Sequence, residues 1–172
     1  MRTFDVRHEM IVGTQRFWQL IHHENEFIRS LYVDFLDFGY EILEENKETG
    51  IRRAYITPKV DAPKAIVRVM GDSISFTENG QLVEDPDDYR YEFTVVPNKF
   101  ADKITISGAM RAHPISDDKC ERCVTFNVSC TIFGIGKLLE GFIQKEIRRS
   151  YVESAAYTNT YLKKVESERA DG

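Results

Sequence analysis

The chain has 172 residues, of which 42% are apolar and 30% are charged, and its formal net charge is −5. This length and composition suit one globular domain with one sizeable core. No stretch approaches the roughly 18 apolar residues of a spanning helix, and the first residues lack the apolar core of a signal peptide. The acidic balance disfavours nucleic acid as a partner, because phosphate binding needs a basic surplus. We therefore expect a cytoplasmic domain at residues 1–166, followed by a polar tail at 167–172.

Periodicity along the chain predicts mainly strands, followed by one long helix. In chain order, the predicted elements are a strand at 2–12, short helices from 14 and at 24–32, strands at 39–46 and 51–58, two helical turns at 64–70, strands at 73–84, 89–96, 103–115 and 122–133, and a helix at 136–165. Gly50 supplies the permissive backbone of one turn, and Asn79-Gly80 marks either a bulge or a hairpin tip. Clean alternation in the later strands indicates a meandering antiparallel sheet with one buried face.

The final helix is the most informative element. Its apolar residues recur at helical spacing over about 45 Å, so the helix must lie across the sheet to bury them. Its middle, however, carries small or hydroxylated residues such as Ser150, Ser154 and Ala155. Small side chains where a sheet should be met predict a gap between the helix and the sheet. The sequence therefore predicts an α+β fold, a curved seven-stranded antiparallel sheet around a C-terminal helix, with a ligand cavity between them.

Three sequence features resemble those of one superfamily. They are the strand–helix–helix opening with Phe17-Trp18, the proline-bounded insert after the third strand, and the entry to the long helix at residues 133–137. With these features the chain resembles the START-like superfamily, also called helix-grip, polyketide cyclase-like or SRPBCC. Residues 137–140, followed by Glu146, are similar to a bacterial branch related to sterol and lipid-transfer domains. The resemblance implies the order strand, two helices, six strands and one helix, with a deep cavity.

Inward-facing positions supply the candidate ligand contacts. The residues that we expect to line the cavity are His8, Phe76, Tyr91, Phe93, Ile106, Met110, Phe126, Val128, Cys130, Phe142, Ser150 and Ser154. Tyr91 can give a ligand one hydrogen bond from an otherwise apolar wall. His8 can act as a general base or orient a ligand, or it can be a buried histidine satisfied by its neighbours. The aromatic residues can line a pocket or simply fill a core.

The other polar motifs favour ordinary structural roles. Cys120 and Cys123 form a CxxC motif with Cys120 in a turn, but no second pair completes a structural zinc site. We therefore expect no metal and no cofactor. His22 and His23 end a helix and are expected to be exposed, and His113 is expected to face outward from its strand. No catalytic motif of a known enzyme class occurs, so no catalytic residue is assigned.

The segment at 64–70 has two interpretations. Ile66, Val69 and Met70 share an apolar face beside the basic residues Lys64 and Arg68. A lid that makes transient contact with a membrane has this pattern. A packed connector between two strands has the same pattern.

These predictions lead to two main hypotheses for function. The first is a non-catalytic carrier or sensor that holds a hydrophobic ligand, such as a lipid or a sterol, in the cavity. The second is a cyclase or dehydratase type of enzyme that uses His8 or Tyr91 as acid or base. The lack of a clustered acid–base pair in the sequence favours the first. An interaction module without a ligand is a third and weaker hypothesis.

Overall fold

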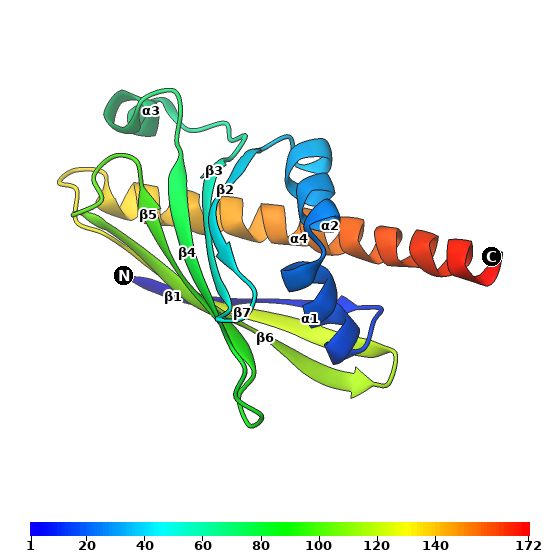
Figure 1. Cartoon of the computed structure of the whole chain (residues 1–172). Helices are drawn as coiled ribbons and strands as arrows, with labels where there is room; N and C mark the ends of the chain where they lie inside the picture. Colours follow the sequence, from blue (N-terminus) through cyan, green and yellow to red (C-terminus); the bar gives the residue numbers. More distant parts are fainter.

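Seven strands form one sheet in the computed structural model, which describes all 172 residues (Figure 1). The strands are β1 (Arg2–Met10), β2 (Gly39–Asn46), β3 (Ile51–Thr57), β4 (Phe76–Val83), β5 (Arg90–Pro97), β6 (Ile104–Ser116) and β7 (Lys119–Cys130). Their order across the sheet is β1-β7-β6-β5-β4-β3-β2, so consecutive strands from β2 to β7 are neighbours. Every pairing is antiparallel, which confirms the predicted meander.

Short helices follow β1, and one long helix ends the chain. The helical elements are α1 (Thr14–His23), α2 (Asn25–Arg29), the π-helical segment η1 (Ser30–Phe35), α3 (Lys64–Met70) and α4 (Gly136–Ala170). α4 runs unbroken across one face of the curved sheet (Figure 1). This is the predicted helix-grip architecture, with α3 inserted between β3 and β4. None of these helices combines the length and the apolar content needed to cross a bilayer.

The hydrophobic core lies between the inner face of the sheet and the helices. On β1, Phe4 and Val6 are buried beside their register partners Phe126 and Val124 of β7, as the alternation predicts. A second, smaller cluster ties α3 to β6 and α4, and its buried members are Ile66, Met70, Ile104 and Leu139. The core therefore consists of a main cluster, to which the sheet, α1, α2, η1 and α4 contribute, and of the smaller cluster beneath α3.

Several element boundaries differ from the sequence prediction, two of them with a consequence for the local structure. β7 begins at Lys119 rather than at residue 122, because Ser116 pairs directly with Lys119 across a two-residue turn. Cys120 is consequently a buried strand residue and not a turn residue. The second short helix ends at Arg29, and the chain continues as the wider π-helical turns of η1.

Two further differences concern β4 and α4. β4 runs straight through Asn79-Gly80 without a bulge or a hairpin tip, because it pairs with β3 on one side and with β5 on the other. Gly80 is needed there because the Tyr91 ring lies over it, and a Cβ at this position would collide with the Tyr91 hydroxyl. α4 continues beyond residue 165 to Ala170 through exposed polar residues. Several of these are good helix formers, so the helix does not need burial to extend.

Candidate ligand-binding cavities

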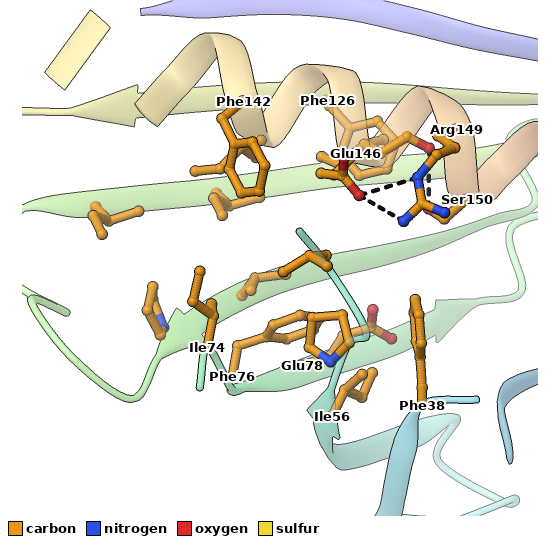
Figure 2. Close-up of a pocket in the computed structure, with 18 of the residues that line it drawn as sticks. Phe38, Ile56, Ile74, Phe76, Glu78, Phe126, Phe142, Glu146, Arg149 and Ser150 are labelled. Carbon is orange, nitrogen blue, oxygen red and sulfur yellow. Dashed lines mark hydrogen bonds and ion pairs between the residues drawn. The ribbon is translucent and has the colours of Figure 1, made fainter. Parts of the chain in front are cut away.

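The gap predicted between the long helix and the sheet is present. α4 packs against β1 and β7 at one edge of the sheet, and residues of β3, β4 and β5 line the space that remains. This larger cavity has a volume of about 180 Å³, and 17 of its 23 lining residues are hydrophobic. Phe142 of α4 and Phe76 of β4 lie on opposite walls (Figure 2). The larger cavity is therefore a mostly apolar site.

A smaller cavity of about 120 Å³ lies next to the larger one, and α1, α2 and η1 contribute to its lining. Of its 22 lining residues, 15 are hydrophobic, and the rest include several buried ionisable groups. The residues that line both cavities are Tyr32, Phe38, Glu78, Phe93, Ser150 and Tyr151. The two cavities thus share a wall, and a rearrangement of side chains in that wall would join them.

Glu78 is a carboxyl group common to both cavities. Tyr91 donates a hydrogen bond from its hydroxyl to Glu78 Oε1 at 3.2 Å. Burial raises the pKa of Glu78, and the Tyr91 hydrogen bond and the charge of Arg52 oppose this shift. Burial, followed by the nearby Glu78, raises the pKa of Tyr91. A carboxyl with a raised pKa in a mostly apolar site can hold a proton or exchange it with a ligand.

Arg52 of β3 also lines the smaller cavity and has a full set of partners. Its guanidinium pairs with Glu45 at 3.2 Å and donates to the carbonyl oxygens of Ile21 and His22 at 3.1 and 2.6 Å. These bonds hold the end of α1 against the sheet, so His22 is buried and not exposed as predicted. Burial, and then the charge of Arg52, lowers the pKa of His22 to about 4. His22 is therefore neutral at pH 7, while His23 is exposed as expected.

His8 lies beside a buried arginine rather than in a cavity. Arg122 Nη2 contacts His8 Nδ1 at 3.2 Å. Burial, and then the charge of Arg122, lowers the pKa of His8. A neutral imidazole can accept a hydrogen bond from Arg122 Nη2 at Nδ1. His8 is half-buried, and its contact with Arg122 is of the kind that the alternative of a histidine bonded to its neighbours predicts.

The structure brings most of the predicted contact residues together. Those that line the larger cavity are Met70, Phe76, Phe93, Ile106, Phe126, Phe142 and Ser150. Those that line the smaller cavity are Tyr91, Phe93, Met110, Ser150 and Ser154.

Five predicted residues lie outside both cavities: His8, Ile66, Val69, Val128 and Cys130. Val128 is buried on β7, where α4 packs directly on the sheet and leaves no space. Cys130 ends β7 beside the start of α4, where its N–H donates to Glu140. Ile66 is fully buried in the cluster beneath α3, and Val69 is half-buried.

Sequence reasoning missed the ionisable groups of the cavities. Glu78, Arg52 and Arg122 line the smaller cavity, although none was proposed as a contact. A signal was present for all three. Glu78 is in phase with Phe76, and Arg122 is in phase with Val124 on the inner face. Arg52 is likewise in phase with the apolar residues Ala54 and Ile56 of its strand. Charged residues at inward positions are uncommon unless they are paired or functional. The alternation of inward and outward positions along each strand could therefore have identified these charged residues as candidates.

The CxxC motif cannot act as one site. Cys120 and Cys123 are three residues apart in a strand, so their side chains leave opposite faces of the sheet. Burial raises the pKa of Cys120 to about 11, which keeps it a thiol at neutral pH. His113 is exposed, as its outward position predicts. No group of three or more histidine, cysteine, aspartate or glutamate side chains is arranged to hold a metal ion.

An ion pair closes one side of the larger cavity. Arg149 pairs with Glu146 one turn earlier on α4 at 2.6 Å (Figure 2). Arg149 also donates to the backbone oxygen of Lys59, in the loop after β3, at 3.4 Å. These bonds connect α4 to the segment that leads to α3. Of these, only the hydrogen bond of 3.4 Å to the Lys59 oxygen joins α4 to this segment. It is long and lies between exposed groups, so little free energy is needed to break it.

The order of the elements and the antiparallel sheet around α4 are those of a START-like, helix-grip fold. Residues 5–162 match the family model described as "Protein of unknown function (DUF2505)", and the chain belongs to that family. No curated protein matches the chain.

Several solved structures share the fold at low identity. The Zhui aromatase/cyclase from Streptomyces sp. R1128 is 14% identical, with a TM-score of 0.68 over 94% of this chain and 95% of that chain. Norcoclaurine synthase from Thalictrum flavum, solved with dopamine and hydroxybenzaldehyde, is 10% identical, with a TM-score of 0.65 over 94% and 87%. A START superfamily protein from Mycobacterium smegmatis is 8% identical, with a TM-score of 0.62 over 92% and 98%. At these identities the likeness establishes the fold alone.

The raised pKa of Glu78 makes stability depend on pH in a defined direction. The folded state holds this proton more tightly than the unfolded chain, whose glutamate pKa is near 4.5. Ionising Glu78 therefore costs stability as the pH rises above 4.5 and towards the folded pKa. We expect Glu78→Gln to gain free energy of unfolding relative to the wild type over this range, as measured by urea denaturation.

Glu41→Gln controls for the loss of one negative charge, because it removes an exposed carboxyl on β2. A difference between Glu78→Gln and the wild type that stays constant with pH, or shrinks as the pH rises, would contradict a raised pKa.

Proposed function

We propose that the protein binds a hydrophobic small molecule in the larger cavity and carries or senses it. The observation that supports this most directly is the mostly apolar cavity between the sheet and α4. The apolar side chains that line an unfilled cavity lack contact partners on one side and so lose dispersion energy. A hydrophobic ligand would recover that energy by contact with the lining.

The size of the cavity limits the ligand in the closed state. An apolar cavity of about 150 Å³ is sufficient for a benzene-sized molecule, and the larger cavity has about 180 Å³. A single ring or a short chain therefore fits without rearrangement. A ligand of sterol or long-chain lipid size requires the wall around Glu78 and Tyr151 to move, so that both cavities are used.

We further propose that α3 acts as a lid over the larger cavity. Met70 lines the cavity from α3, and Ile66 anchors the helix against Leu139 and Ile104. Lifting α3 would expose these apolar residues beside the exposed cations Lys64 and Arg68. Such a surface suits transient contact with an anionic membrane.

A second candidate function is an enzyme of the cyclase type. The Glu78–Tyr91 pair favours it, because a carboxyl and a phenol in contact inside a mostly apolar site can act as acid and base. The sequence predicted either His8 or Tyr91 as the acid or base, and Glu78, which was not predicted, is in contact with Tyr91. The proposal of a carrier comes first because the larger cavity offers extensive apolar contact and few polar groups.

A substitution that fills the larger cavity tests the main proposal. Ile143→Trp on α4 places a bulky ring in the cavity. We expect the affinity for the neutral fluorescent probe N-phenyl-1-naphthylamine to fall by about tenfold or more, while thermal unfolding stays cooperative. Val152→Trp, at a position on α4 that is 56% exposed, is the matched control and should bind like the wild type. Unchanged binding by Ile143→Trp, or no binding of the probe by the wild type, would count against the proposal.

Proton abstraction from carbon tests the enzyme candidate. In 5-nitrobenzisoxazole, a base removes the proton on carbon 3, the N–O bond breaks, and 2-hydroxy-5-nitrobenzonitrile forms as its phenolate. If Glu78 acts as a base, the wild type should accelerate this reaction, and Glu78→Gln should lose about 10²-fold or more of the acceleration. Glu41→Gln should retain it. A rate in the wild type no higher than in buffer, or equal rates in the wild type and Glu78→Gln, would remove support for a base at this position.

Charge reversal on α3 tests the lid. Lys64→Glu combined with Arg68→Glu changes two exposed residues and leaves the buried face of α3 intact. We expect sedimentation with phosphatidylserine-containing vesicles to weaken, since each cation near an anionic surface contributes about 1 kcal/mol. Lys163→Glu with Lys164→Glu, both exposed near the end of α4, is the matched control. Equal vesicle binding by the two double variants and the wild type would mean that α3 is only a connector.

A further inference from the structure

Arg122 is a buried cation in the wall of the smaller cavity. Its side chain enters from β7, and the residue is only 6% exposed. The groups that act on its charge are Tyr151, Tyr32 and Cys120, and none of them is a carboxylate. Burying a guanidinium without a counter-charge is expensive. The fold therefore keeps an uncompensated positive charge beside a cavity.

The guanidinium is held rigidly by neutral groups. Nη1 donates to Ser154 Oγ at 3.1 Å, and Nη2 donates to the Tyr151 carbonyl oxygen at 2.9 Å. Nη2 also contacts His8 Nδ1 at 3.2 Å, and the guanidinium carbon lies 4.8 Å from the centre of the Tyr151 ring. These contacts orient the plane of the group without neutralising it.

One donor of Arg122 has no partner. Its Nε is the one buried side-chain nitrogen or oxygen of the structure that makes no hydrogen bond. Almost all buried polar groups in folded proteins are satisfied, so an exception requires an explanation. A charged group that is oriented by four contacts, and still has a free N–H, is arranged to receive an acceptor from outside the chain.

The other charged groups of the smaller cavity do not supply that acceptor. Arg52 already pairs with Glu45. Glu78 accepts from Tyr91 and is acted on by the charge of Arg52, and Arg122 is not among the groups that shift its pKa. The charge of Arg122 is therefore the unbalanced one.

We propose that the smaller cavity is a subsite for an anionic group of the ligand, in which a carboxylate oxygen accepts from Arg122 Nε. This inference rests on the proposed ligand-binding function and specifies its ligand as an amphipathic carboxylic acid. The carboxylate lies against Arg122, and the apolar part extends past Ser150 and Tyr151 into the larger cavity.

The charge and the size of the site favour a carboxylate over a phosphate. One unpaired cation balances one negative charge, whereas a phosphate monoester carries about −1.5 to −2 at neutral pH and three acceptor oxygens. The single free Nε–H matches one oxygen, and a cavity of about 120 Å³ that is mostly apolar offers few further donors. A phosphate would be left with unsatisfied acceptors and an unbalanced charge.

Titration calorimetry with matched eight-carbon ligands tests the subsite. We expect the wild type to bind octanoate about tenfold or more tightly than 1-octanol, because a hydrogen bond to a charged group is the stronger kind. Octyl phosphate should bind less tightly than octanoate. Arg122→Met should lose the preference for octanoate over 1-octanol. Arg7→Met, on the outer face of the neighbouring strand β1, is the matched control and should keep it.

Each other outcome overturns a defined part of the proposal. Binding of 1-octanol with no preference for octanoate, or a preference that persists in Arg122→Met, rejects the subsite and leaves the ligand-binding function standing. Binding of neither compound rejects both. A preference for octyl phosphate rejects the carboxylate. If Arg122→Met fails to unfold cooperatively, Arg122→Lys decides, because it keeps the charge and lacks the Nε–H: loss of the preference supports the subsite, and full retention rejects it.

Discussion

The cavities exist because α4 is fixed along one edge of the sheet. At its start, Glu140 accepts from the Cys130 N–H at 2.8 Å and pairs with the terminal amino group of Met1 at 3.4 Å. Further along, Asn159 accepts from the Ile11 N–H and donates to the Glu9 carbonyl oxygen, each at 3.0 Å. These bonds hold the helix beside β1 and β7. The sheet curves away from this edge, so β3, β4 and β5 cannot also reach the helix, and the space between them remains.

Three ionisable residues, Arg52, Glu78 and Arg122, lie in the walls of the smaller cavity. Arg52 is balanced by the carboxylate of Glu45 and donates to two carbonyl oxygens at the end of α1. Arg122 has only neutral partners, and Glu78 shares one hydrogen bond with a phenol. Both are less stable arrangements than paired or apolar alternatives. Under the proposed ligand-binding function, this cost in stability is accepted because both residues lie in cavity walls, where a ligand can contact them.

The strands and the long helix could be predicted because alternation and helical spacing are local properties of the sequence. The small residues of α4, including Ser150, predicted the gap for the same reason. Where the structure differs from the prediction, the residues are placed by contacts between distant segments of the chain. His22 is buried because Arg52 binds the end of its helix, and Val128 lies outside the cavities because Glu140 and Asn159 hold α4 against its end of the sheet. No local pattern records such contacts, although the inward phase of Glu78 and Arg122 was visible.

The anionic subsite and the catalytic role of Glu78 oppose each other. Both residues line the smaller cavity, but Arg122 is not among the groups that shift the pKa of Glu78, and a carboxylate bound at Arg122 has its charge balanced there. The apolar part of the same ligand would instead cover Glu78, which also lines the larger cavity, and exclude water from it. Loss of water disfavours the ionised carboxyl, so the pKa of Glu78 rises further. Glu78 then stays protonated and acts as a hydrogen-bond donor, not as a base, which favours a carrier or sensor over base catalysis.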